Sequence, residues 1–246
     1  KKIRSLISSP EIKLITLTVT EKGYHFDENK NLLLNDEITN DLKDEKLLTV
    51  IGHLSYGLID RFKKNKEKIT ILSCDNLSEN GYVLKNLITS FVKKIEPDCL
   101  EWLNMNVDFP LSMVDGIVPN NNKTSEFFDL PYEDNSLVVT EPYREWYIQS
   151  QDKQLQNLLS NRKINFVKDV KFYEYIKLKV LNASHSALAY IGHLLGYDYV
   201  HEAINDDICY NFISNFLDKE VIPTLPYKND FDIKPYKYQV LNRFKN

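Results

Sequence analysis

The sequence predicts an α/β domain over residues 1–168 followed by a mostly α-helical domain over residues 169–246. Apolar, β-branched segments alternate with helical periodicity as far as residue 95, which is the pattern of an α/β layered domain. Helical periodicity then dominates beyond residue 168. A chain of 246 residues is also long enough to form two such cores.

Four elements build the predicted α/β domain. Residues 12–20, IKLITLTVT, are apolar on both faces, as in a strand buried within a parallel sheet. A helical period covers residues 46–64, and its lysine-rich last turn suits a helix C-terminus. A second buried strand is expected at 68–74 and a second helix at 82–95.

The later segments follow from weaker patterns. After the second helix, short extended pieces are expected to add mostly β structure that completes the sheet, with an exposed loop at 120–128. Residues 169–196 favour one long helix or two, with Gly196 as a C-terminal stop. A single further helix is expected over residues 200–222, ended by Pro223.

Composition and charge narrow the classes of function. The net charge is -4, and the basic stretches are short and interrupted by acids, so nucleic acid and anionic membranes are not expected as partners. No apolar run approaches the roughly 20 residues that span a bilayer. The three cysteines are widely spaced, without zinc-site spacing, and we expect reduced thiols, no metal site and a cytoplasmic location.

Residues 177–186, KLKVLNASHS, include the first candidate site. On a regular helix of about 100° per residue, Lys177, Asn182 and His185 share one broad face with Glu174. A lysine there would act as a general base if burial or a nearby cation lowered its pKa. The alternative is a surface pair of Lys177 and Glu174 beside a core or boundary histidine, and geometry alone favours it.

The loop SCDNLSENG, residues 73–81, is the second candidate site. It follows a predicted strand at the carboxyl edge of the sheet, where α/β domains bind their ligands, as does TEKGY at 20–24. Asn76 would donate a hydrogen bond there to a substrate or cofactor. A turn with a helix N-cap explains Asp75 and Asn76 equally well.

Five motifs, in order along nearly the whole chain, resemble the polyol-specific long-chain dehydrogenase/reductase family, which includes mannitol 2-dehydrogenase and fructuronate reductase. They are LTVTEKGY, SCDNLSENG, FPLSMVDGIVP, EPYREW and KLKVLNASHSALAYIGHLLGY. The resemblance implies a Rossmann-type nucleotide domain joined to a mostly helical domain, with the active site between them. It implies a monomeric, metal-independent enzyme that uses NAD, with NADP as an open alternative. The implied substrate pairs are mannitol/fructose and mannonate/fructuronate.

The resemblance also implies a role for each site residue. The family pattern of Lys, four residues, Asn, two residues and His falls on Lys177, Asn182 and His185. By that resemblance Lys177 is the general base, and Asn182 and Asn76 hold the developing oxyanion. His185 would orient the substrate hydroxyl, and Glu174 matches a glutamate associated with proton and water passage.

Departures from the family pattern concern the cofactor. Asp115 in MVDGIV matches an aspartate near the cofactor, which makes Asn76 and Asp115 the expected cofactor-binding residues. Gly116 replaces a usual arginine, and Ala183 replaces a usual glycine. No two of the seven glycines form a GxG, so the turn that approaches a pyrophosphate is absent.

The resemblance therefore predicts a truncated, central fragment of such an enzyme. Residues 1–168 would be a partial Rossmann-type domain without its first strand and Gly-rich loop, and residues 169–246 would begin the helical catalytic domain. The alternative is a degenerate family member without dehydrogenase activity that serves as an interaction module.

Overall fold

The computed structural model divides into two compact units. Unit 1 comprises residues 1–114 and 145–170, and unit 2 comprises residues 115–144 and 171–246. The predicted domain boundary near residue 168 stays a prediction. The structure describes residues 2–44, 46–118, 134, 136–160, 163–226 and 231–245.

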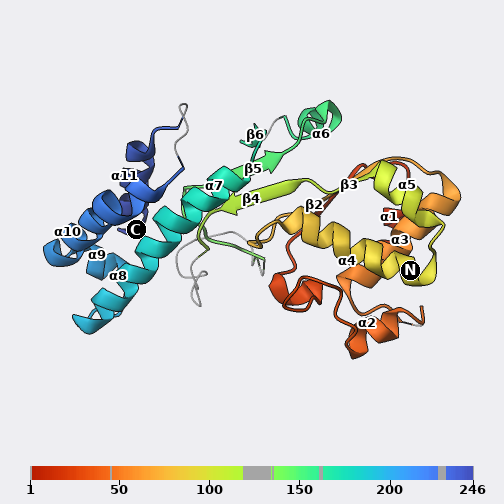
Figure 1. Cartoon of the computed structure of the whole chain (residues 1–246), viewed down its shortest axis with the longest axis horizontal. Helices are drawn as coiled ribbons and strands as arrows, with labels where there is room; N and C mark the ends of the chain where they lie inside the picture. Colours follow the sequence, from red (N-terminus) through yellow and green to blue (C-terminus); the bar gives the residue numbers. More distant parts are fainter. Residues whose placement is uncertain are drawn as a thin grey trace. The chain divides into compact units, whose positions relative to one another are not determined.

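A parallel sheet in the order β1-β2-β3 forms the centre of unit 1 (Figure 1). Its strands are β1 (Leu14–Leu17), β2 (Ile69–Ser73) and β3 (Val107–Asp108), with Ile15 opposite Ile71. Every residue of the middle strand β2 is buried, as expected for a strand covered on both faces. Both predicted strands are confirmed, and β1 is shorter than its apolar run.

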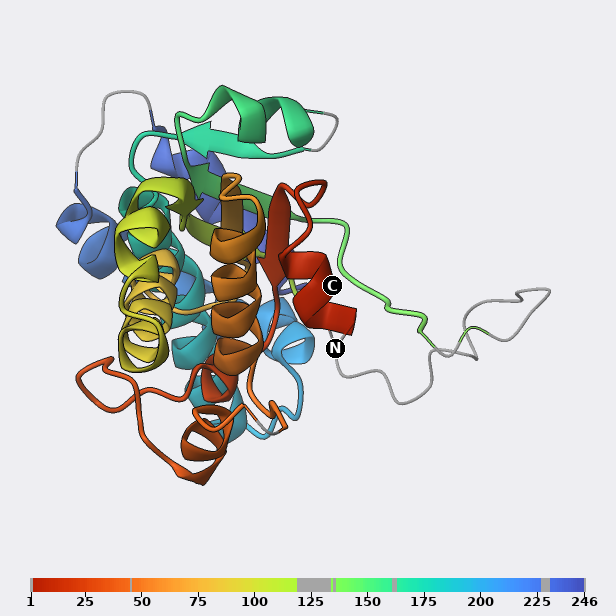
Figure 2. The same ribbon diagram turned by 90° about the vertical axis from the view of Figure 1, so that its right-hand side faces the viewer.

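The helices of unit 1 pack around this sheet. Figure 2 shows α3 (Val50–Lys64) and α4 (Asn80–Ile95) side by side, and they confirm the two predicted helices. Thr49 begins α3, because its hydroxyl accepts a hydrogen bond from the Gly52 amide. The shorter helices of this unit are η1 (Glu21–Tyr24), α1 (Lys2–Ile7), α2 (Asp36–Asp41), α5 (Cys99–Asn106) and α6 (Lys153–Leu158).

A second three-stranded sheet, in the order β4-β5-β6, corrects one prediction. Its strands are β4 (Leu111–Asp115), β5 (Glu145–Gln149) and β6 (Asn165–Val167). These segments were expected to complete the first sheet, but β3 already pairs with β2, and Pro110 then interrupts the strand because it lacks an N–H. The loop expected at 120–128 lies outside the described residues.

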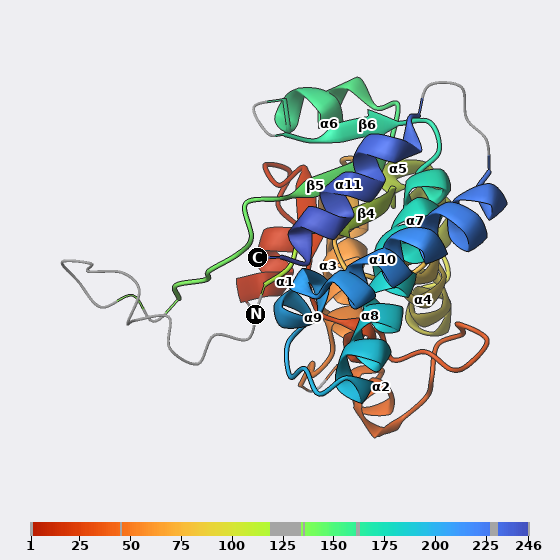
Figure 3. The ribbon, with the colours of Figure 1, turned by 90° about the vertical axis from the view of Figure 1, so that its left-hand side faces the viewer.

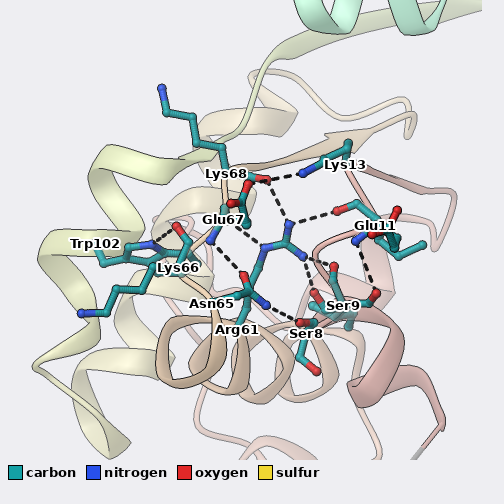
Figure 4. Close-up of polar contacts among 12 residues, drawn as sticks. Ser8, Ser9, Glu11, Lys13, Arg61, Asn65, Lys66, Glu67, Lys68 and Trp102 are labelled. Carbon is teal, nitrogen blue, oxygen red and sulfur yellow. Dashed lines mark hydrogen bonds and ion pairs between the residues drawn. The ribbon is translucent and has the colours of Figure 1, made fainter.

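A buried arginine, Arg61, joins the segments that lead into β1 and β2 (Figure 4). Its guanidinium donates five hydrogen bonds of 2.6 to 3.1 Å, one from each N–H, and all the acceptors are backbone carbonyls. Burial lowers the pKa of Arg61, but an arginine stays charged in proteins. The carbonyls belong to Ile7, Ser9, Ile12, Glu67 and Lys68.

One continuous helix crosses unit 2 and contains a π-helical stretch. It consists of α7 (Lys171–Ile176), η3 (Lys177–Asn182), which is the π-helix, and α8 (Ala183–Leu194), and Figure 1 shows them in line. Gly196 follows with φ of 90°, a left-handed conformation that suits glycine after a helix end. The predicted helix and its glycine stop are confirmed.

The single helix expected over 200–222 is wrong. The chain forms α9 (Val200–Asn205) and α10 (Asp207–Phe216), and Figure 3 shows them packed with α8. Asp206 separates them in an extended conformation, and its carboxylate accepts hydrogen bonds from the Ile208 and Cys209 amides. The helix breaks because this aspartate caps a new helix start.

A π-helix, a short 3-10 helix and an unpredicted α-helix complete unit 2. They are η4 (Leu217–Val221), η5 (Ile222–Thr224) and α11 (Ile233–Arg243). Pro235 lies in the first turn of α11, where a missing N–H is tolerated. The predicted fold class, an α/β part followed by a mostly helical part, is confirmed. Within the described ranges, no helix is both long enough and apolar enough to cross a bilayer.

We predict that Arg61→Lys lowers the free energy of unfolding by about 2–4 kcal/mol, because one ammonium cannot satisfy five carbonyls. Urea unfolding followed by tryptophan fluorescence measures this loss, since Trp102 donates to the neighbouring Lys66 carbonyl. Arg4→Lys is the matched control: Arg4 binds Asp60 and Asp44 at a partly exposed position, and its change should cost less than about 1 kcal/mol. Equal losses in both variants would contradict the role given to Arg61.

Candidate functional site

The Asp75 carboxylate joins the ends of β1 and β2 at the carboxyl edge of the first sheet. It accepts hydrogen bonds from the amides of Val19 at 3.2 Å and Thr20 at 2.8 Å, and from the Tyr24 hydroxyl at 2.6 Å. The Tyr24 hydroxyl also contacts Ser73 Oγ at 2.5 Å. Burial, with the hydrogen bond to Asp75, raises the pKa of Tyr24, so this phenol remains protonated. Asp75 is therefore engaged within the fold.

The buried Asn80 amide fixes the other end of the same loop. Its Nδ2 donates to the carbonyls of Ser112, Asp75 and Ser73, and its Oδ1 accepts from the amides of Ser112 and Gly81. The two bonds to the Ser112 backbone, of 2.9 and 3.1 Å, connect the end of β2 with β4. A residue with this role was not among the predicted site residues, although it lies within the SCDNLSENG motif.

Gly81 has to be a glycine because the chain passes close to it. A Cβ at this position would lie 2.5 Å from the carbonyl oxygens of Phe109 and Pro110. Asp75, Asn80 and Gly81 thus support the turn interpretation of this loop, while the Asn76 side chain remains exposed between them. Hydrogen bonds of Asp75 and Asn80 therefore fix this loop on both sides of Asn76, which lies at the edge where α/β sheets bind ligands.

The helical geometry assumed for Lys177 and Asn182 is wrong, because these residues begin and end the π-helix η3. The Ala183 amide donates to the Leu178 carbonyl, five residues back, whereas an α-helix pairs residues four apart. Residues five apart in such a stretch lie one turn apart, so Lys177 and Asn182 are neighbours along one face. π-Helical turns within α-helices are frequent at functional sites.

The burial of the predicted residues differs from that expected for a surface pair beside a core histidine. Glu174, Lys177 and Asn182 are half-buried, and His185 is exposed, with its ring 5.6 Å from that of Phe244. His185 is therefore not a core histidine. Burial lowers the pKa of Lys177 from its ordinary value, which is the condition that a lysine base requires.

A cluster of the buried Asp115 and Arg243 with the half-buried Glu141 and Tyr143 lies in the same unit; we call it the Arg243 cluster. Arg243 binds both oxygens of Asp115 at 2.9 Å, and it binds Glu141 at 2.7 and 3.0 Å. Its guanidinium carbon lies 4.0 Å from the centroid of the Tyr143 ring. Asp115, which the sequence placed near the cofactor, is thus held by an arginine that sequence patterns did not indicate.

Charges from three elements act on Lys177. Asp115 on β4 and Glu174 on α7 raise its pKa, and Arg243 on α11 lowers it, while burial is the largest influence. The structure therefore brings Lys177 and Asp115 into one electrostatic environment. Asn76 belongs to unit 1, and its predicted role with Lys177 stays a prediction.

The described residues include side chains suited to proton transfer and hydrogen bonding. Burial raises the pKa of both Cys74 and Cys99 to about 11, so these thiols are protonated near neutral pH. In the described part of the chain, no three His, Cys, Asp or Glu side chains are grouped as metal ligands. An amine of lowered pKa beside amides suits the reversible deprotonation of an alcohol.

Comparisons with known proteins match nearly the whole chain to one family. Residues 1–160 match the family model described as the mannitol dehydrogenase Rossmann domain, and residues 169–246 match the mannitol dehydrogenase C-terminal domain. Mannitol dehydrogenase 2 of Saccharomyces cerevisiae is 36% identical over 98% of this chain and 49% of its own length. Mannitol 2-dehydrogenase of Emericella nidulans is 34% identical over 98% of this chain and 50% of its own.

Two solved structures share the fold over 100% of this chain, each at 31% identity. Substrate-free D-sorbitol dehydrogenase has a TM-score of 0.88 and is covered over 52% of its length. Mannitol 2-dehydrogenase of Pseudomonas fluorescens, in a ternary complex with NAD and D-mannitol, has a TM-score of 0.84 and is covered over 51%. The chain thus spans about half the length of the relatives it matches. The matches confirm the resemblance predicted from the order of the motifs.

We predict that Asn80→Asp lowers the free energy of unfolding by about 2–4 kcal/mol at pH 8, because the new carboxylate would face three carbonyl oxygens. The fold should raise the pKa of this carboxyl, so the loss should grow as pH rises above about 4 and be smaller at pH 5 than at pH 8. Urea unfolding at both values measures it. Asn86→Asp is the control, because Asn86 is exposed on the same helix. A loss at position 80 that is as small as the control's would rule out the proposed role of the amide.

Proposed function

This chain belongs to the mannitol dehydrogenase family, and we propose from that premise that the protein transfers a hydride between NAD and a secondary alcohol of a polyol or sugar acid. The observation that carries the proposal is Lys177, which is half-buried in a π-helical turn and has a pKa below the ordinary lysine value. We further propose that the protein acts as a cytoplasmic monomer. Its three cysteines, none of which forms a disulfide, are consistent with that compartment.

We assign Lys177 as the general base that removes the hydroxyl proton during oxidation and returns it during reduction. A general base works best when its pKa lies near the working pH, and burial moves the pKa of Lys177 in that direction. Glu174 has a charge that acts on Lys177, and we assign it to the passage of the proton between the lysine and solvent.

We assign Asn182 and Asn76 to the oxyanion that develops on the alcohol oxygen. Asn182 lies one π turn after Lys177, so its amide is on the face that presents the base. The Asn76 side chain is exposed at the carboxyl end of β2 and offers a second amide donor. His185, exposed three residues after Asn182, would orient the substrate hydroxyl.

The carboxyl edge of the parallel sheet suits the nicotinamide end of NAD. Dinucleotides bind at this edge in α/β sheets, and a neutral amide such as that of Asn76 has both donor and acceptor groups. We propose Asn76 and Asp115 as the residues of this chain that would hold the cofactor. When bound, NAD supplies the nicotinamide ring that accepts the hydride. The 246 residues contain no GxG turn for its pyrophosphate, and NADP is an open alternative.

The first test is the substrate. Relatives named mannitol 2-dehydrogenase, one of them solved with NAD and D-mannitol, favour mannitol and fructose as the first pair, with mannonate and fructuronate as the second. The protein expressed from its complete coding sequence should oxidise NADH in the presence of fructose or fructuronate, and parallel assays with NADPH would define the cofactor. Absence of turnover with every combination would reject the proposal and favour the interaction module.

We predict that Lys177→Ala lowers the rate of fructose or fructuronate reduction by roughly 10² to 10⁴-fold, since the proton donor is lost, while NADH affinity stays near the wild-type value. Steady-state kinetics and NADH fluorescence titration measure the two effects. The wild-type oxidation rate should rise with pH through the pKa of Lys177, at values below the ordinary lysine pKa of about 10.4.

Lys179→Ala is the matched control for this prediction. Lys179 is exposed in the same π-helical stretch, with its ammonium 5.6 Å from the centroid of the Tyr175 ring. Its removal should leave turnover near the wild-type rate. Turnover retained in Lys177→Ala, or lost equally in Lys179→Ala, would exclude Lys177 as the base.

A further inference from the structure

We propose that Arg243 is a positioning residue for Lys177, because by binding both oxygens of Asp115 it keeps that carboxylate from forming an ion pair with the lysine. This inference rests on the proposed function, in which Lys177 has to lose its proton to act as a base. Arg243 itself would not touch the substrate in this role.

The geometry of the Arg243 cluster is that of a fully engaged cation. Nη1 and Nη2 each bind one oxygen of Asp115 at 2.9 Å, while Nε and Nη2 bind the two oxygens of Glu141 at 3.0 and 2.7 Å. The side chains of Arg243 and Asp115 are each only 4% exposed. Paired hydrogen bonds between a planar guanidinium and a carboxylate fix both direction and distance. Asp115 is therefore held in one orientation.

Helix packing within unit 2 brings this cluster near the candidate base. Asp115 is the last residue of β4 and Arg243 is the last residue of α11. Helix α11 packs against η3, the π-helical stretch that begins at Lys177. Glu141 is fixed in turn by Ile117, whose amide donates to its carboxylate at 2.7 Å. The cluster thus forms part of the scaffold behind the lysine.

The charges around Lys177 determine in which direction the loss of Arg243 would change the pKa of the lysine. Asp115 and Glu174 favour the charged lysine, and Arg243 opposes them. The π-helix η4 also packs against η3, and its Asp218 is paired with Lys237 at 2.7 Å. If Arg243 loses its charge, Asp115 and Glu141 remain as two buried carboxylates without their cation. Such acids attract another cation, and Lys177 is a cation on which Asp115 already acts.

The experiment compares Arg243→Gln, Arg243→Lys and a control in the protein expressed from its complete coding sequence. Lys237→Gln is the control because Lys237 lies on the same helix, is 5% exposed and binds Asp218 outside the cluster. The measurement is kcat/KM for polyol oxidation against pH. In Arg243→Gln the rise of kcat/KM with pH that reports deprotonation of Lys177 should move to higher pH by at least about one unit. At a fixed pH within this rise, kcat/KM should fall about tenfold. The profile of Lys237→Gln should match the wild type.

A second measurement does not depend on turnover. Reductive methylation with formaldehyde and cyanoborohydride modifies neutral amines, and mass spectrometry of the peptide that contains Lys177 gives its extent at each pH. The methylation profile of Arg243→Gln should shift in the same direction as its kinetic profile. Adding Asp115→Asn to Arg243→Gln should move the methylation profile back toward the wild type, which a merely structural role of Arg243 would not produce.

The outcomes separate this inference from the proposed function. A wild-type protein without polyol turnover rejects the function, and the methylation profiles still decide whether Arg243 controls Lys177. Wild-type turnover with an unshifted profile in Arg243→Gln overturns the inference alone. If Arg243→Gln fails to fold, the test relies on Arg243→Lys, which keeps the charge but loses the paired bonds. A smaller shift of its profile to higher pH supports the inference, and a wild-type profile overturns it.

Discussion

The buried guanidinium of Arg61 is the interaction on which unit 1 depends. An arginine cannot lose its proton, so its burial is stable only when every N–H finds an acceptor, and here five carbonyls supply them. These carbonyls come from the segments before β1 and β2, while Asp75 joins the same two strands at their opposite ends. The parallel pair is therefore fixed at both ends, and the loop bearing Asn76 follows from a rigid strand.

Three buried or half-buried cationic side chains of this chain compensate for the loss of hydration in different ways. Arg61 is satisfied by carbonyl dipoles, and Arg243 is satisfied by the carboxylates of Asp115 and Glu141. Burial lowers the pKa of Lys177, and a lysine can lose its proton in a protein, whereas an arginine stays charged. The residue whose charge can change is thus the one that we propose for proton transfer, and Arg243 keeps its own charge in the same unit.

Features that depend on neighbours in the chain were predictable, whereas those that depend on distant partners were not. The strands β1 and β2 were predictable from residues 12–20 and 68–74, because burial on both faces requires an apolar pattern within each segment itself. The bond between Asp115 and Arg243 joins residues 128 positions apart, so no local pattern reports it. Asp206 interrupts an otherwise continuous helical period by capping with one carboxylate. For the site, motif order identified Lys177 and its companions, and their roles remain predictions.

The π turn couples the spacing of Lys177 and Asn182 in the sequence to the winding of their helix. Lys177 and Asn182 are neighbours only because the turn between them contains an extra residue compared with an α-helix. If this stretch wound as a regular α-helix without losing a residue, every later side chain of α8, His185 included, would rotate by about 100° relative to Lys177, whereas deletion of one residue within η3 would keep them on the same face. Transfer of the pair to a regular helical scaffold would therefore require a separation of four residues rather than five, whereas copying the motif letter by letter would separate the amine from its amide.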